Sequence, residues 1–310
     1  MTNFRLTLLI LLSACLFSMC VASPNKEQES AELGHHLLQQ GRKYLNNDEY
    51  PNAINRFNQA LVFYESYDDI TGIAHCHFGL AEAAVALGKL GLAKKYLRNL
   101  YAMEGKTKID RFDSMVRMLD VKIEYFSGMY GRAIENLEPL LPEFDDMGRL
   151  SQKVDIQTLN VTAIRTLLAF KTNFDQAKQW TQRFEALLFS YGKDSPTHNA
   201  SLDRFNAQIM AHNKEYNQAE ELLGNALAFY KETDDRRGIA ATLRELGLLM
   251  IAQHRWAEAD DLLHRALKIR TLIFDRLGTN ILLNDLIAMN KTLGNDAQVI
   301  RYQEMLLELD

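Results

Sequence analysis

Small and apolar side chains recur at helical spacing in one stretch near the N-terminus. Gly41 and Tyr44 fall on one side of a first helix. Ala53, Phe57 and Ala60 follow one turn apart on a second. Because small side chains let helices approach closely, we expect Gly41 and Ala53 where the two helices cross. The pattern predicts two short amphipathic helices folded against each other.

The alanine of the second helix recurs at nearly constant spacing along the chain. Its successive equivalents are 40, 40, 44, 42, 40 and 40 residues apart. Two such helices cannot bury their apolar faces alone, whereas a stack of them buries a continuous core. The anchor positions are Ala53, Ala93, Ala133, Ala177, Ala219, Ala259 and Val299. The spacing predicts seven stacked helix pairs, numbered here as units one to seven.

A direct comparison of the chain with itself gives the same register. Residues 60–64 (ALVFY) resemble 226–230 (ALAFY), and 68–74 (DDITGIA) resemble 234–240 (DDRRGIA). The offset is 166 residues in both cases, which is also the distance from Ala53 to Ala219. Two independent patterns therefore agree on the alignment of unit one with unit five.

The order G-x2-Y…A-x3-F-x2-A resembles the signature of the tetratricopeptide repeat family. The period exceeds the 34 residues of the standard repeat and is similar to longer variants, and the family's Trp and Pro are mostly missing. The resemblance covers residues 31–310. It implies an all-α solenoid of about seven antiparallel helix pairs, a right-handed superhelix whose first helices line a concave, protein-binding groove.

Three features locate breaks or starts within this array. Pro51 suits the first turn of a helix. Pro139 and Pro142 fall near the end of the second helix of unit three, where we expect the helix to end early or kink. Residues 190–199 (SYGKDSPTHN) form the most turn-rich internal segment and are our candidate for a flexible joint.

The N-terminal residues 1–22 have the pattern of an export signal, and the polar residues 23–30 then form a linker to the repeat domain, 31–310. Leu12 to Cys15 resembles a bacterial lipobox, which would make Cys15 a lipidated N-terminus. Cleavage after Ala22 and an uncleaved membrane anchor are the two alternatives. All three place the folded domain in the cell envelope, in the periplasm or attached to the outer membrane.

Composition narrows the partners. The chain of 310 residues is 47% hydrophobic with five prolines, which suits a helical protein. Its net charge of -5 gives no general attraction to nucleic acid. If the chain is cleaved before Ser23, Cys76 alone remains of three cysteines and no intrachain disulfide forms. The oligomeric state stays open.

No motif for catalysis or cofactor binding is recognised. His75, Cys76 and His77 are adjacent, so their side chains point in different directions on a helix and do not form a metal site. The pairs Asp68-Asp69 and Asp234-Asp235 recur at equivalent joints and are interpreted as solvated features or helix caps. The basic cluster between Lys94 and Arg111 is interpreted as a solvated surface.

The remaining candidate site is the groove that the resemblance implies. Its expected residues are Leu38, Arg42, His75, Phe78, Glu82, Met115, Met118, Lys122, Tyr125, Arg204 and Arg244, with Leu159, Thr162 and Thr166 from unit four and Gln208 and Leu248 from units five and six. We expect about half to be exposed, because groove and core stripes adjoin on one helix.

These features predict a non-catalytic adaptor that binds a protein or peptide, because a solenoid offers a large surface without an enclosed pocket. The N-terminal half of the groove is richer in Phe, Met and Tyr, which suits adaptable apolar recognition. One alternative is a peptide-sensing regulator whose groove closes on a ligand. An enzyme is a further alternative, for which no convergent catalytic group can be named.

Overall fold

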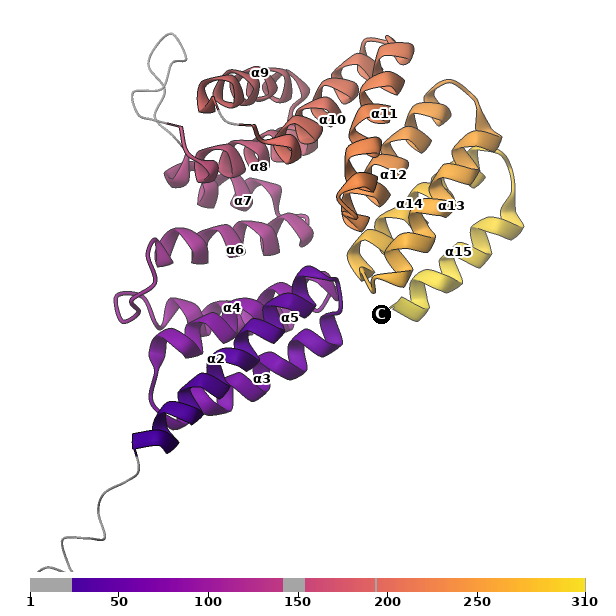
Figure 1. The fold of residues 1–310 in the computed structure, drawn as a ribbon. Helices are drawn as coiled ribbons and strands as arrows, with labels where there is room; N and C mark the ends of the chain where they lie inside the picture. The colour runs from indigo at the N-terminus through magenta and orange to yellow at the C-terminus, as the bar shows by residue number, and fades with distance from the viewer. Residues whose placement is uncertain (1–23, 142–153, 193, 310) are drawn as a thin grey trace, which may run out of the picture.

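The computed structural model describes residues 24–141, 154–192 and 194–309. Within these ranges the chain forms fourteen α-helices and no strand, and consecutive helices pack as seven hairpins (Figure 1). The pairs are α2 (Pro24–Asn46) with α3 (Tyr50–Ser66), α4 (Ile70–Ala86) with α5 (Leu90–Tyr101), α6 (Phe112–Phe126) with α7 (Tyr130–Leu137), α8 (Ile156–Thr172) with α9 (Phe174–Tyr191), α10 (Pro196–His212) with α11 (Tyr216–Glu232), α12 (Arg236–Ala252) with α13 (Trp256–Leu272), and α14 (Arg276–Thr292) with α15 (Asp296–Leu309). The predicted all-α solenoid is confirmed.

The anchor positions occupy the same place in every hairpin. Each is the fourth residue of the second helix of its pair, from Ala53 in α3 to Val299 in α15. The six alanines are fully buried and Val299 is nearly so. The spacing found in the sequence is therefore a spacing of helix crossings, as predicted.

Most hairpins are joined by one kind of turn. Nine connections are three residues long, and their middle residue has a positive φ. Asp68 (φ 51°) is followed by Asp69, whose carboxylate accepts hydrogen bonds from the amides of Thr71 and Gly72, both at 3.0 Å. A carboxylate at this position satisfies amides that the first helical turn leaves free. The prediction that the paired aspartates include helix caps is confirmed.

Close packing at equivalent glycines supports the 166-residue offset. A Cβ added at Gly72 would lie 2.1 Å from the Tyr64 ring, and one added at Gly238 would lie 2.3 Å from the Tyr230 ring. Only a glycine lets the tyrosine of the preceding helix lie this close to the backbone. Units one and five therefore pack against their following helices in the same way.

Units three and four depart from this regularity. The helix α7 ends at Leu137 and continues as a 3-10 turn, Glu138–Leu140, because Pro139 has no amide hydrogen to donate. The early end is confirmed, while Pro142 lies outside the described residues. In unit four Asn173 alone separates α8 from α9, and its side chain accepts a hydrogen bond from the Gln176 amide at 3.0 Å.

The N-terminal predictions fall largely outside the described residues. Residues 1–23, with Cys15, are among those not described. The helix α2 begins at Pro24, so residues 24–30 continue the first helix instead of forming a separate linker; Pro suits a first helical turn. None of the described helices is both long and apolar enough to cross a membrane.

The two ends of the array meet, which bends the solenoid into a nearly closed ring (Figure 1). Asp48, before α3, forms an ion pair with Arg237 of α12 at 3.0 Å. The Arg237 guanidinium also lies over the Tyr50 ring, 5.1 Å from its centre. Leu277 of α14 packs against the core formed by α4 to α6. We call these four residues the closure contact.

Candidate functional site

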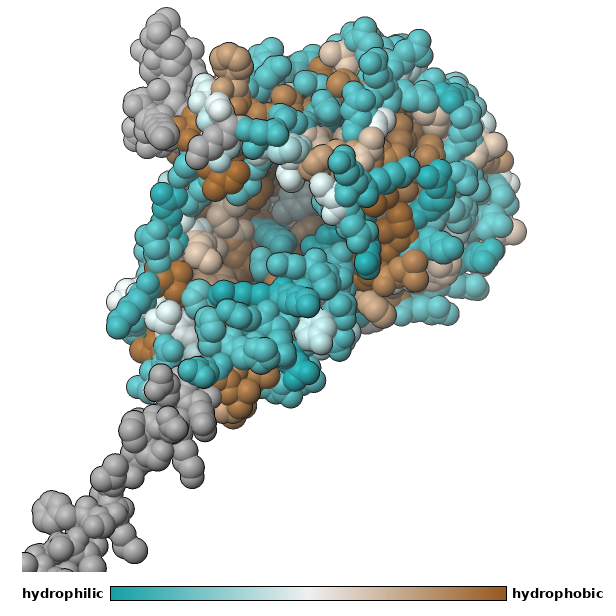
Figure 2. Space-filling model, viewed as in Figure 1, coloured by the Kyte–Doolittle hydropathy of each residue, from teal (hydrophilic) through white to brown (hydrophobic). Residues whose placement is uncertain are grey.

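The closed ring surrounds a central cavity of about 1130 Å³. Its wall is built by the first helix of units two to seven, and the space-filling view shows the hollow in the middle of the molecule (Figure 2). The sequence predicted an open groove without an enclosed pocket, and this prediction is wrong. The closure contact joins the ends of the superhelix, so the groove becomes a central cavity. A cavity of this size holds a ligand much larger than a single amino acid.

One side of the cavity, built by α4 and α6, is mainly apolar apart from the Glu82–Lys122 ion pair. Phe78 of α4 and Met115, Met118 and Phe126 of α6 line it, and Leu248 of α12 lies on the wall that α12 contributes. Phe78 is held by edge-to-face packing on Phe112, with ring centres 5.6 Å apart. Methionine side chains adapt their shape to a partner, so this wall suits apolar ligand side chains of varied form.

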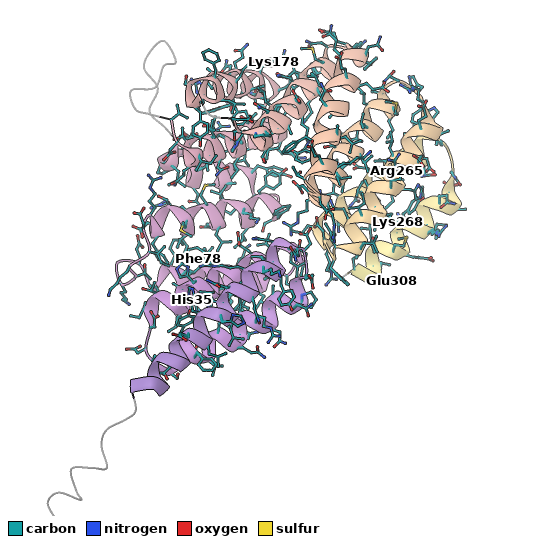
Figure 3. The ribbon with its side chains drawn as sticks, in the orientation of Figure 1. His35, Phe78, Lys178, Arg265, Lys268 and Glu308 are labelled. Atoms are coloured by element: carbon teal, nitrogen blue, oxygen red, sulfur yellow. The ribbon has the colours of Figure 1, made fainter. Side chains whose placement is uncertain are left out.

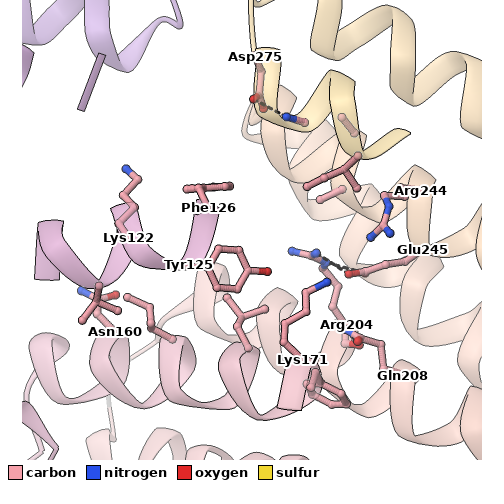
Figure 4. Close-up of a pocket in the computed structure, with 18 of the residues that line it drawn as sticks. Lys122, Tyr125, Phe126, Asn160, Lys171, Arg204, Gln208, Arg244, Glu245 and Asp275 are labelled. Atoms are coloured by element: carbon pink, nitrogen blue, oxygen red, sulfur yellow. Dashed lines mark hydrogen bonds and ion pairs between the residues drawn. The ribbon is translucent and has the colours of Figure 1, made fainter. Parts of the chain in front are cut away.

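The opposite side carries ordered ion pairs between neighbouring first helices (Figure 4). Arg204 of α10 makes a two-pronged contact with Glu245 of α12, at 2.6 and 2.8 Å. One repeat later, Arg244 contacts Asp285 of α14 in the same way. In both pairs the partner lies 41 residues further along the chain, so the solenoid repeats the contact. Bidentate geometry holds the guanidinium planes in fixed directions.

Three further cations of the wall also have carboxylate partners. Lys122 Nζ lies 3.9 Å from Glu82, Arg111 lies 3.1 Å from Asp155, and Arg270 is paired with Asp275. The Asp155 carboxylate also accepts hydrogen bonds from the backbone amide and hydroxyl of Thr158, which with the Arg111 contact lower its pKa. These groups are neutralised within the wall.

Lys171, near the end of α8, differs from the other cations. No carboxylate of the described residues lies within 4.0 Å of its Nζ. Burial lowers the pKa of Lys171, nearby Arg244 lowers it further, and Asp285 and Glu245 act in the opposite direction. In Figure 4 the Lys171 amino group and the Tyr125 ring both extend toward the Arg204–Glu245 pair.

Eight of the eleven principal groove residues lie at the cavity wall: Phe78, Glu82, Met115, Met118, Lys122, Tyr125, Arg204 and Arg244. The other three, from the first helix of unit one and the start of unit two, are placed elsewhere. Leu38 is buried in the core at 3% exposure. Arg42 donates a hydrogen bond of 3.0 Å to His75 Nδ1, and neither residue belongs to the lining of the cavity. Unit one lies beside the cavity, so its first helix does not reach it.

The predictions for unit four are wrong for a geometric reason. Leu159, Thr162 and Thr166 are fully buried, and the cavity is lined instead by Asn160, Ile164, Leu167 and Lys171. In units two, three, five and six, wall residues lie 15 and 11 residues before the anchor alanine, with a three-residue turn between the helices. In unit four the turn is one residue long, so Thr162 and Thr166, at the same distances from Ala177, lie two residues too early on α8.

Asn160 is held by a short chain of hydrogen bonds. His198 Nε2 lies 3.0 Å from Asn160 Oδ1, and His198 Nδ1 lies 2.7 Å from the Ser195 hydroxyl. Burial lowers the pKa of His198, which favours the neutral ring. These contacts tie α8 to the start of α10, across part of the segment that the sequence proposed as a flexible joint. The spacing of the repeats gives no signal for them.

The remaining sequence candidates do not converge on a site. Cys76 is buried, and its burial raises the pKa of the thiol to about 12. Among the described residues no group of three or more metal-ligating side chains is close enough to hold an ion. Arg111, expected in the basic cluster, turns into the cavity wall instead.

Comparisons with known proteins agree with this architecture. Residues 199–271 match the model of the tetratricopeptide repeat family, a segment that runs from α10 to α13. A Rap protein in complex with Competence and Sporulation Factor has a similar fold, with a TM-score of 0.60 and 11% identity over 90% of this chain and 76% of its own. The apo form of RapI gives 0.58 and 14% over 89% and 97%.

A third solved structure, yeast Tom70, covers 90% of this chain and 77% of its own at 13% identity, with a TM-score of only 0.34. No curated protein matches the chain. At these identities the two Rap structures establish the fold alone. The family match identifies tetratricopeptide repeats in residues 199–271.

Proposed function

We propose that this protein binds a peptide, or an extended segment of a partner protein, inside its central cavity. The observation that supports this most is the cavity itself: one wall is apolar and adaptable, and the opposite wall carries ion pairs of fixed geometry. Apolar surface provides affinity, while a few fixed polar groups orient the ligand. A similar protein, Rap, has been solved with a bound factor.

We propose further that the binding is non-catalytic and serves an adaptor in the cell envelope. Repeat solenoids offer extended surfaces that suit binding. The location depends on residues 1–22, whose charge and hydropathy pattern is that of an export signal. Fractionation of wild type and Cys15→Ala tests this: release of the variant from membranes supports lipidation, and a wild-type protein found only in cytosol contradicts the envelope location.

A second candidate is a sensor whose ring closes on its ligand. The closure contact favours it, because few contacts hold the ends of the array together: the ion pair of Arg237 with Asp48, its stacking on Tyr50 and the packing of Leu277. Small-angle scattering with and without ligand separates the two candidates. A sensor becomes more compact on binding, whereas a constitutive adaptor keeps its radius of gyration.

The experiment for the main proposal is selection from random peptide libraries on immobilised protein. Peptides retained by wild type are then measured against Phe78→Ala combined with Met118→Ala. We expect the double variant to lose at least tenfold in affinity, because it removes apolar contact area from the cavity.

The matched control is Leu272→Ala combined with Leu307→Ala. Both leucines are exposed outside the cavity, at 68% and 75%, so we expect unchanged binding. Retention of no peptide, or equal binding by both double variants, would contradict the proposal.

A further inference from the structure

We propose that Lys171 forms a carboxylate-binding subsite, so that the preferred ligand is a short acidic peptide whose carboxylate lies beside α8. The inference rests on the proposed function and specifies the chemistry of its ligand. It starts from a comparison of the charged groups around the cavity.

The cations of the lining fall into two classes. Arg111, Lys122, Arg204, Arg244 and Arg270 each have a carboxylate within 4.0 Å. Lys171 lines the same cavity without a described carboxylate at that distance. Glu245 and Asp285 favour the charged form of Lys171 from further away, but each is already paired with an arginine. A ligand carboxylate would give this partly desolvated ammonium a direct partner.

A second donor extends toward the same ion pair as the Lys171 amino group. The Tyr125 hydroxyl makes no hydrogen bond to another described residue, and Arg204 and Arg244 are near enough to act on its pKa. Arg244 also acts on the pKa of Lys171. Tyr125 and Lys171 therefore face one region of the cavity (Figure 4). The charges of Arg204 and Arg244 there are balanced by Glu245 and Asp285, so Lys171 supplies the net positive charge of this group. An ammonium and a hydroxyl can together donate to both oxygens of a carboxylate.

The length of the cavity sets the size of the ligand. Asp110 lies in the lining just before the start of α6, whereas Tyr125 lies near the end of this helix. At 1.5 Å per helical residue, α6 from Phe112 to Tyr125 is about 20 Å long. An extended peptide of about six residues covers that distance at about 3.5 Å per residue. Met115 and Met118 lie between these ends and suit apolar side chains in the middle of the peptide.

The test uses three randomised hexapeptide libraries passed over the immobilised full chain. One has a free C-terminal carboxylate and no acidic residue, one has a C-terminal amide with a single Glu, and one has the amide with Gln in place of Glu. Retained peptides are quantified by mass spectrometry. We expect at least tenfold greater retention of one or both carboxylate libraries than of the neutral one, and the first two libraries distinguish a terminal from a side-chain carboxylate.

Variants test whether Lys171 causes the preference for the carboxylate libraries over the neutral one. Lys171→Met should reduce this preference to less than twofold, and Lys171→Arg should keep it. Lys268→Met makes the same change of charge on α13, well apart from Phe78 and the cavity (Figure 3), and should leave the preference unchanged. Melting curves by circular dichroism confirm that each variant is folded.

The outcomes separate the two proposals. Peptides retained without a preference for carboxylates, or a preference that survives in Lys171→Met, would overturn the subsite and leave peptide binding intact. Retention of no peptide from any library would overturn the proposed function, and the subsite with it.

Discussion

The fourth and sixth helix pairs pack in the same way but present different side chains to the cavity. Both have a fully buried alanine as the fourth residue of the second helix, Ala177 and Ala259. They differ in the turn: three residues precede α13, and Asn173 alone precedes α9. The anchor therefore fixes how each hairpin packs, while the length of the turn fixes which face of the first helix meets the cavity.

The difference has a chemical consequence. In unit six the first helix presents Arg244, which is neutralised by the next unit. In unit four the first helix presents Lys171 and Asn160 to the cavity, whereas the same places relative to the helix end in unit six are Ile251 and Ala240. The irregular unit thus adds polar groups to the wall that are not engaged in the repeated ion pairs.

The strongest test of the comparison is overpacking at the shared anchor. Ala177→Leu and Ala259→Leu should each lower the free energy of unfolding by about 2 kcal/mol, because a leucine does not fit a helix crossing. Ala228→Leu, at an exposed site on α11, should change it by less than about 0.5 kcal/mol. Urea unfolding measures all three. If Ala177→Leu leaves the free energy of unfolding unchanged while Ala259→Leu lowers it, Ala177 does not lie at a helix crossing like that of unit six.

The repeated ion pairs of the inner wall should contribute more than their counterparts outside. Glu245→Gln leaves the shielded Arg204 without its charged partner and should destabilise by about 1 to 2 kcal/mol. Asp261→Asn breaks the exposed pair with Arg265 on the outer face and should cost less than about 0.5 kcal/mol. If both variants lower the stability in thermal unfolding equally, the ion pairs of the inner wall are no better shielded from solvent than the exposed pair.

The two kinds of turn should respond in opposite directions to substitution. Asn173→Ala removes the cap on α9 and should destabilise by about 1 kcal/mol. Phe274, in a three-residue turn, has φ 54°, which is unfavourable for a bulky side chain, so Phe274→Gly should stabilise by about 1 kcal/mol. Differential scanning calorimetry gives both signs. A loss of stability in Phe274→Gly would show that packing of the Phe274 side chain stabilises the protein more than its positive φ destabilises it.

Removing Arg237 from the closure contact should change shape more than stability. Arg237→Ala deletes the ion pair with Asp48 and the stacking on Tyr50, and its effect on unfolding should stay below about 1 kcal/mol. We expect a larger radius of gyration by small-angle scattering, because the ends of the array separate. Arg236→Ala, which lies next to it and pairs with the exposed Asp234, is the control and should leave the radius unchanged.

The sequence predicts the fold well because the repeats are local. Ala53 and its equivalents mark the crossing within each of the seven described hairpins, and the two aspartate pairs mark two of the turns. The closure contact is beyond such reasoning, since Asp48 and Arg237 lie far apart in the chain and no repeat pattern links them. The same holds for Lys171, whose place on the wall depends on a turn shortened to one residue.

The central claim is that a ligand lies inside the ring, against the first helices. It is tested most directly with a photo-cross-linking residue at Met118, which faces the cavity, and in a second protein at Leu307, which is exposed outside it. We predict that a peptide selected from the libraries is cross-linked at position 118 and not at 307, and that excess unlabelled peptide abolishes the product. Cross-linking at 307 with none at 118, while the peptide still binds, would contradict the account.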